Sequence, residues 1–158
     1  MAGDPLAPPV APPGAPPVAP SLAPPLGPVL ETGLYVADLA RAAAFYEGVL
    51  GLSPMLADAR FRAYALGGTV LLLFKRGAAN ETVTLPGGTI PPHDAAGRAH
   101  VAIAIAAETL ADWRTHLARH AIPIEGEMAW PKGGVSLYFR DPDGALLELA
   151  TPGLWPNY

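Results

Sequence analysis

Hydrophobic positions between residues 29 and 76 follow the two periods of regular secondary structure. Residues 29–36 are β-forming and apolar, and helical spacing then relates Leu39, Ala42, Ala43, Tyr46, Val49 and Leu50. Asp38 is a favourable N-cap for this predicted helix, and Gly51 ends it. Three apolar runs follow at residues 54–58, 61–66 and 70–75. The pattern predicts the order β-α-β-β-β.

The same order of elements returns in the second half of the chain. The pattern predicts a strand at 99–105, a helix at 108–120 and a strand at 122–128. Two more strands are predicted within residues 135–151, as a β-hairpin around the turn Asp141-Pro142-Asp143-Gly144. The repeated order indicates a duplicated module.

The chain is expected to divide into a tail and one domain. Residues 1–28 contain eleven prolines and one charged side chain, so they are predicted to be a disordered, extended tail. A ligand for a proline-binding domain of the SH3 type is the alternative for this tail. Residues 29–158 are the predicted domain, with modules at about 29–76 and 98–153. Residues 77–97 lack periodicity and are predicted as a long connecting loop.

Composition and charge limit the kinds of binding partner and the cellular compartment that we expect. The formal net charge is -4 and the basic residues do not cluster, which argues against a nucleic-acid partner. No apolar run has the length of a membrane span, and prolines interrupt the tail where a signal peptide would need a continuous apolar run. We therefore expect a cytoplasmic protein without a membrane partner. The absence of cysteine excludes disulfides, thiolate ligands and a cysteine nucleophile.

Glu148 is an ionisable residue within an apolar predicted strand. Period-two alternation places Leu147 and Leu149 on one face and Glu148 on the other. A carboxylate in this position is costly unless it is solvated, paired or bound to a metal. Pairing with Arg140 across the hairpin is the simplest alternative to a metal.

Two further strands each carry a metal-competent side chain on the face away from the helices. Alternation directs Val101, Ile103 and Ile105 toward a helix and leaves His100 on the opposite face. It likewise directs Leu34 and Val36 inward and leaves Glu31 outward. A hydrogen-bonded core histidine is the alternative for His100. Three strands that offer Glu31, His100 and Glu148 to a shared concave surface predict a metal site.

These segments together resemble the vicinal oxygen chelate superfamily, which includes glyoxalase I, extradiol dioxygenases, fosfomycin-resistance enzymes and bleomycin-resistance proteins. The matching segments are Glu31-Thr-Gly-Leu-Tyr-Val with residues 44–52, His100-Val-Ala-Ile-Ala-Ile, and residues 136–148. The resemblance covers the chain from about Val29 to the C-terminus. It implies an α+β fold in which two βαβββ modules form a curled mixed sheet around a cup. It also implies a divalent metal held by Glu31, His100 and Glu148.

The resemblance leaves the substrate open. Glu31 stands where many members have histidine, so the set has one imidazole and two carboxylates instead of the two histidines and one carboxylate of non-haem iron oxygenases. A further ligand of glyoxalase I falls at about Leu72, which cannot bind a metal. The donor set favours Mn²⁺, Fe²⁺, Zn²⁺ or Ni²⁺ without choosing among them.

Two functions are expected from these observations. The first is a divalent-metal-dependent enzyme of lyase, isomerase or dioxygenase type, acting on a small substrate that chelates the metal through neighbouring oxygens. The second is a metal-free protein that sequesters a hydrophobic or cationic small molecule, as bleomycin-resistance relatives do. The intact ligand set favours the first.

Other residues are candidates for the chemistry beside the metal. Glu148 is also expected to be catalytic, and His93 is either an acid or base near the substrate or an ordinary loop residue. Tyr138 and Arg140 are expected to bind substrate or to fill the pocket, and Trp130 to close the cup or to pack on it. A homodimer is expected because relatives of this size pair their modules between chains. In that case Glu31 reaches the metal of the other subunit.

Overall fold

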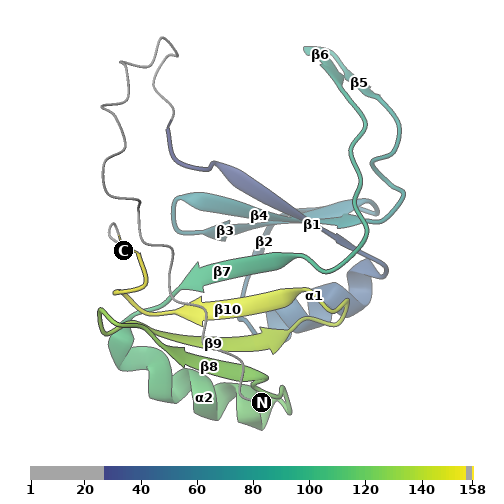
Figure 1. Ribbon diagram of the computed structural model, residues 1–158. Coiled ribbons are helices and arrows are strands. Elements are labelled where there is room, and N and C mark those ends of the chain that lie inside the picture. Colours follow the sequence, from purple (N-terminus) through teal and green to yellow (C-terminus); the bar gives the residue numbers. More distant parts are fainter. Residues whose placement is uncertain (1–26, 156–157) are drawn as a thin grey trace, which may run out of the picture.

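The computed structural model describes residues 27–155 and residue 158, and it contains two βαβββ modules (Figure 1). The first comprises β1 (Glu31–Val36), α1 (Leu39–Gly48), β2 (Pro54–Ala57), β3 (Phe61–Leu66) and β4 (Thr69–Lys75). The second comprises β7 (His100–Ala104), a 3-10 turn (Ala107–Thr109), α2 (Leu110–Arg119), β8 (Gly126–Ala129), β9 (Val135–Arg140) and β10 (Leu146–Ala150). This confirms the α+β class and the duplication. All but the last two residues of the expected tail lie outside the described part of the chain.

Each module forms its own four-stranded mixed sheet with the same strand arrangement. The orders are β1-β4-β3-β2 and β7-β10-β9-β8, with the first and last strands of each module parallel. In the first ladder Gly33 lies opposite Leu72, and in the second Ala102 lies opposite Glu148. Glu31 stands two residues before Gly33, and His100 stands two residues before Ala102. The two ladders therefore correspond position by position.

Local sequence explains where the helices begin and end. The carboxylate of Asp38 accepts hydrogen bonds from the backbone N–H groups of Ala40, at 2.8 Å, and Arg41, at 3.1 Å, which confirms the predicted N-cap. The helix ends at Gly48, three residues before the predicted stop at Gly51. The predicted start of the second helix at Glu108 is a 3-10 turn, and the α-helix begins at Leu110.

Two strand predictions need correction. The strand expected at 122–128 begins only at Gly126, since Pro123 lacks a backbone donor and the flanking Ile122 and Ile124 pack on the core instead. The strand expected from Val29 begins at Glu31.

The segment expected as a plain loop contains a hairpin of β5 (Val83–Leu85) and β6 (Gly88–Ile90). Its three-residue strands are too short to show a period, although Pro86-Gly87 is a recognisable turn. The hairpin extends well away from both sheets (Figure 1). We call residues 78–93 the arm.

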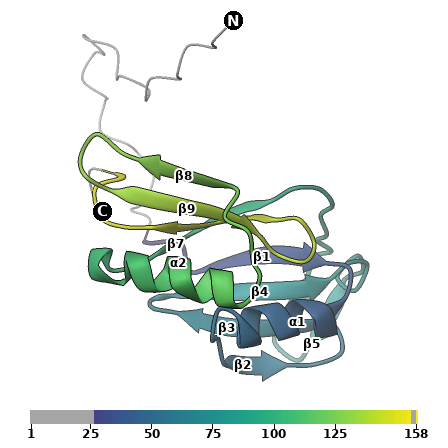
Figure 2. The same ribbon diagram turned by 90° about the horizontal axis from the view of Figure 1, so that it is seen from below.

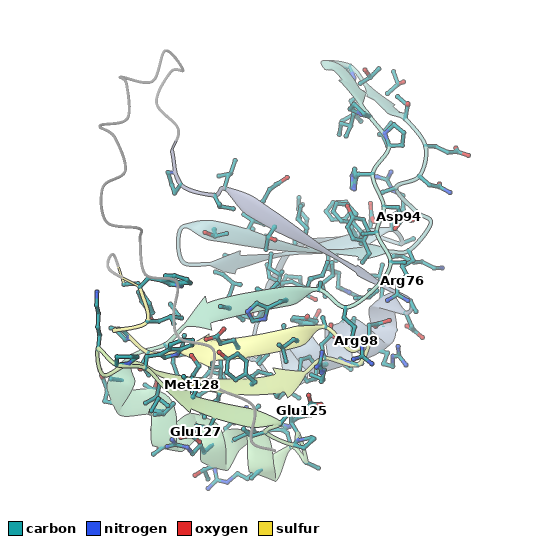
Figure 3. The ribbon with its side chains drawn as sticks, viewed as in Figure 1. Arg76, Asp94, Arg98, Glu125, Glu127 and Met128 are labelled. Atoms are coloured by element: carbon teal, nitrogen blue, oxygen red, sulfur yellow. The ribbon has the colours of Figure 1, made fainter. Side chains whose placement is uncertain are left out.

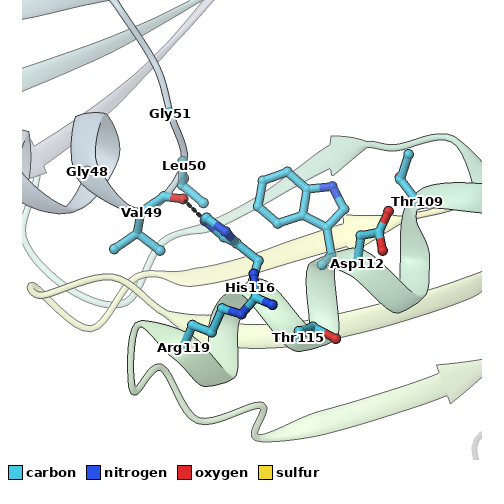
Figure 4. A pocket seen from close by; sticks show the side chains of 10 residues that line it. Gly48, Val49, Leu50, Gly51, Thr109, Asp112, Thr115, His116 and Arg119 are labelled. Carbon is cyan, nitrogen blue, oxygen red and sulfur yellow. Dashed lines mark hydrogen bonds between the residues drawn. The ribbon is translucent and has the colours of Figure 1, made fainter.

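The two modules share one hydrophobic core. The C-terminal end of α1 meets α2 (Figure 2), where His116 Nε2 on α2 lies 2.6 Å from the Val49 carbonyl oxygen that follows α1 (Figure 4). The ring centroids of Phe45 and Phe139, from different modules, are 6.5 Å apart. The core continues through buried aliphatic residues of both halves: Leu34, Val36, Leu71, Leu73, Leu117, Leu137, Leu147 and Leu149. A continuous core predicts that the modules unfold together.

The turn between β9 and β10 fastens the second module to the first. Asp141 is buried and accepts a 3.0 Å hydrogen bond from the Tyr46 hydroxyl on α1. Asp143 accepts a 2.8 Å hydrogen bond from the backbone N–H of Ala37 and lies 3.3 Å from the guanidinium of Arg41. The turn itself was predicted from its Pro and Gly residues, whereas its contacts with the other module were not predicted.

Candidate functional site

His100 and Glu148 meet on the face of the second sheet that points away from the helices. Parallel pairing of β7 with β10 places His100 Nδ1 3.1 Å from the Leu146 carbonyl oxygen. That oxygen can only accept, so Nδ1 carries the proton. The other ring nitrogen, Nε2, lies 3.2 Å from Oε2 of Glu148. Two electron-pair donors in this position require a shared cation, which is either a proton or a metal ion.

The geometry of this pair fits a metal ion. Tetrahedral coordination with bonds of about 2.0 to 2.1 Å separates two ligand atoms by about 3.3 Å. The side chain of His100 is half exposed, whereas that of Glu148 is buried. A buried carboxylate beside an accessible imidazole leaves one open side for a further ligand or substrate. His100 is therefore not a core histidine.

Glu148 is oriented by neighbours on β9 and the loop before it. The hydroxyl of Ser136 donates to Oε1 of Glu148, and Trp130 Nε1 donates to that hydroxyl at 2.8 Å. Trp130 thus acts through Ser136 on the carboxylate. Pairing of Glu148 with Arg140 is wrong, because Arg140 bonds to Glu125, at 3.0 Å, and to the Gly144 carbonyl oxygen.

Tyr138 completes the wall of this face. It lies opposite Glu148 in the ladder, and its ring centroid is 6.4 Å from that of His100. Burial raises the pKa of the Tyr138 phenol, and the nearby Glu148 adds to this effect, while an interaction with Ser136 opposes it. Tyr138 therefore remains a neutral hydrogen-bond donor at physiological pH. Glu127 and Met128 lie beyond it on β8, the edge strand (Figure 3).

Glu31 lies on the other sheet. It is exposed at the start of β1 and lines a cavity of about 600 Å³ over the open face of the first module. Within residues 27–155 and residue 158, no three acidic or histidine side chains converge to hold a metal. One chain thus brings together His100 and Glu148 but not Glu31.

His93 lies at the base of the arm in the same cavity as Glu31. Its Nδ1 is 2.7 Å from the Tyr35 hydroxyl, and its ring meets Phe74 edge-on with centroids 4.7 Å apart. Burial, and to a lesser degree the charge of Asp94, raises the pKa of Tyr35. His93 is therefore a loop residue whose side chain is held in the wall of the pocket.

Sequence reasoning did not assign roles to Ser136 and Tyr35. Period-two alternation does place Ser136 on the face of Glu148, where it is the diagonal cross-strand neighbour of the carboxylate, so a small polar residue at this position was an available signal. For Tyr35 no such signal existed, because its partner His93 is 58 residues away on an irregular segment.

Comparison with known proteins identifies the family. Residues 28–149 match the family model of the Glyoxalase/Bleomycin resistance protein/Dioxygenase superfamily, and the chain belongs to this superfamily. It is similar to a lactoylglutathione lyase from Agrobacterium tumefaciens, with 32% identity and a TM-score of 0.76 over 84% of this chain and 99% of the other.

Two more solved structures are similar to the chain. One is a glyoxalase-related enzyme from Fulvimarina pelagi, with 26% identity and a TM-score of 0.62 over 83% of this chain and 92% of the other. The other is a fosfomycin resistance protein from Listeria monocytogenes, with 18% identity and a TM-score of 0.60 over 82% and 96%. At that identity the second likeness concerns the fold alone. None of the helices in the described residues is long and apolar enough to span a membrane.

Proposed function

We propose that the protein is a divalent-metal-dependent enzyme that acts on a small substrate with two neighbouring oxygens. The observation that carries this proposal is the His100–Glu148 pair. Proton placement on Nδ1 of His100 leaves Nε2 as a lone-pair donor, 3.2 Å from a carboxylate oxygen. Similarity to a lactoylglutathione lyase supports the lyase type within the lyase, isomerase or dioxygenase range.

Glu31 of the partner subunit is the proposed third ligand. Both open faces carry part of a ligand set, and a homodimer that sets the first module of one chain against the second module of the other would bring the parts together. Exposed apolar residues on the first module, among them Met55 and Leu56, support burial against a second copy.

The residues around the pair have distinct proposed roles. Glu148 and His100 hold the ion, which as a Lewis acid would polarise a chelating substrate and stabilise developing negative charge. Ser136 and Trp130 fix the rotamer of Glu148. Tyr138 donates a hydrogen bond to substrate oxygen, and Glu148 or His93 moves a proton. Arg140 is already engaged by Glu125, so a role in substrate binding would require that ion pair to open.

The alternative proposal is a metal-free protein that sequesters an apolar small molecule, in the manner of bleomycin-resistance relatives. The cavity over the first module supports it, because its lining is mainly apolar and it needs no metal. A sequestering protein has no use for the His100–Glu148 pair, which is why we favour the enzyme.

Metal analysis of the purified full-length protein tests the proposal. We expect about one Mn²⁺, Fe²⁺, Zn²⁺ or Ni²⁺ per chain, lost in His100→Ala and Glu148→Ala. The control variants His120→Ala and Glu127→Ala change one histidine and one glutamate elsewhere and should retain it. Circular dichroism should show an intact fold in all four. Full metal content in both site variants would refute the proposal.

A mixing experiment tests the shared site. Chains carrying Glu31→Ala are co-refolded with differently tagged chains carrying Glu148→Ala, and the heterodimer is isolated. If the site is shared, one complete site forms and the heterodimer binds half as much metal as the native dimer. A heterodimer without metal would place all three ligands in one chain, and a monomer in light scattering would refute the dimer.

A further inference from the structure

We infer that the cavity over the first module binds an uncharged apolar group, aryl or alkyl, carried by the same substrate that chelates the metal. The chelating part of this inference rests on the proposed function. The apolar part rests on the cavity itself and can be tested without a metal.

The cavity has a wall as well as a floor, which distinguishes it from an open sheet face. Its floor includes Phe61, Leu72 and Phe74 from the first sheet, and its outer wall includes Val83, Leu85 and Ile90 from the arm. A volume of about 600 Å³ is within the range of small-molecule sites. Leu85 and Ile90 remain 52% and 46% exposed, so an apolar occupant would remove surface that now faces water.

The arm is fastened where it leaves the sheet, beside Arg76 and Asp94 (Figure 3). The backbone N–H of Gly77 donates to Asp94 Oδ2 at 2.6 Å, and that of His93 donates to the Ala79 carbonyl oxygen at 2.7 Å. Ala79 is buried beneath these bonds. These two bonds close the base of the arm and so fix where the outer wall of the cavity leaves the first sheet.

The charges in the cavity argue against an anionic occupant. Its charged lining residues are Glu31, Arg60 and Glu81. The guanidinium of Arg60 is 3.5 Å from the carboxylate of its neighbour Asp58. With Glu31 committed to the proposed metal, no excess positive charge remains to hold a carboxylate or phosphate. The occupant is an uncharged group.

Leu72 links this cavity to the proposed metal. Its ladder position corresponds to that of Glu148 in the second module, so the first module has an apolar side chain where the second has a ligand. Leu72 and Glu31 line the same cavity. An apolar group bound there would therefore be adjacent to oxygens bound at the ion.

Calorimetric titration of the metal-loaded protein with two hydroxamates tests the link. Acetohydroxamate and hexanohydroxamate present the same pair of neighbouring oxygens and differ by four methylenes. Because a buried methylene strengthens binding roughly fourfold, we expect hexanohydroxamate to bind at least about tenfold more tightly. Leu72→Gln and the more exposed Ile90→Gln should each reduce this preference several-fold. Met128→Gln, a similarly exposed position on the second sheet, should leave it unchanged.

Fluorescence of the uncharged probe N-phenyl-1-naphthylamine tests the cavity in metal-stripped protein. We expect equal binding by the native chain and His100→Ala, and several-fold weaker binding by Leu72→Gln and Ile90→Gln. Equal probe binding by all four proteins, or equal affinity for the two hydroxamates, would overturn the inference. So would a failure of the probe to bind because a second copy covers the cavity. If the probe binds as expected but the purified protein contains no metal before stripping, the proposed function is refuted and the inference about the cavity stands.

Discussion

The two modules have the same backbone plan and opposite chemistry on their open faces. In both, a parallel first and last strand put a small residue opposite a functional position, Gly33 opposite Leu72 and Ala102 opposite Glu148. The first face is apolar and walled by an arm, while the second holds a buried carboxylate and a histidine. The same backbone can therefore support an apolar cavity in one copy and a histidine–glutamate pair in the other.

The difference also shows which module carries the energetic cost of a buried carboxylate. Ser136 and Glu148 are buried polar residues beside a hydrophobic core, where a carboxylate needs partners to offset its lost hydration. The first module has Leu72 at the matching position and avoids that cost. A polar cluster retained at such a position is a better indicator of function than the fold itself.

The largest expected effect is on metal affinity, and it comes from exchanging the residue types at the matched positions 72 and 148. Glu148→Leu gives the second module the residue type of the first, so we expect metal affinity to fall by more than about a hundredfold. Leu72→Glu gives the first module a carboxylate next to Glu31, and we expect metal affinity to be kept or increased. Competition with a chromophoric chelator measures both. Equal affinity in Glu148→Leu and the native chain would contradict the assignment of the second module.

Core truncations test whether the modules are one folding unit. Leu71 in the first module and Leu147 in the second are both almost fully buried in the shared core. Leu71→Ala and Leu147→Ala should each reduce the free energy of unfolding by about 2 to 5 kcal/mol. Urea unfolding followed by circular dichroism should remain a single transition, with the exposed Leu56→Ala as control. Two separated transitions in either variant would show that the modules unfold independently.

Two tyrosines compare a contact between the modules with one inside a module. Tyr46 donates to the buried Asp141 of the other module, while Tyr64 donates to Glu47 of its own, at 3.0 Å in each case. Tyr46→Phe leaves a buried carboxylate oxygen without this donor, and we expect a loss of about 1 to 3 kcal/mol. Tyr64→Phe leaves a carboxylate that water can reach, and we expect less than about 1 kcal/mol. If urea unfolding shows the same loss of unfolding free energy in both variants, the contact between the modules stabilises the protein no more than the contact within one module.

Sequence patterns predicted the order of elements in both modules because the helices and most of the strands are long enough to show their period, whereas the bounds of the four-residue β8 were missed. The apolar alternation around Glu148 and His100 also placed these residues on one face, and the structure brings them to 3.2 Å. The hairpin of the arm was missed because its strands have three residues each. The separation of Glu31 from the other two within one chain does not follow from a period of two, which identifies the outer face of a strand but not which sheet it confronts. Only the expected homodimer assigned Glu31 to the metal of another subunit.

The smallest expected effect is a change in melting temperature on substitution at the two helix N-termini. Asp38 caps α1 with its carboxylate, whereas Thr109 before α2 makes no capping bond with its side chain. Asp38→Ala should lower the melting temperature by about 2 °C at neutral pH, and Thr109→Ala should change it by less than about 1 °C.

The pH dependence of this cap distinguishes it from simple helix propensity. Hydrogen bonds from the backbone N–H groups of Arg41 and Ala40 lower the pKa of Asp38 below its ordinary value of 3.8. A lowered pKa in the folded state means that the stabilisation is complete above the unfolded-state pKa and is lost as the pH falls through the folded-state value. The difference between the native chain and Asp38→Ala should therefore shrink in acid, while Asp38→Asn should keep a cap that does not titrate. A pH-independent difference in melting temperature would assign the effect of Asp38→Ala to helix propensity and remove this distinction between the modules.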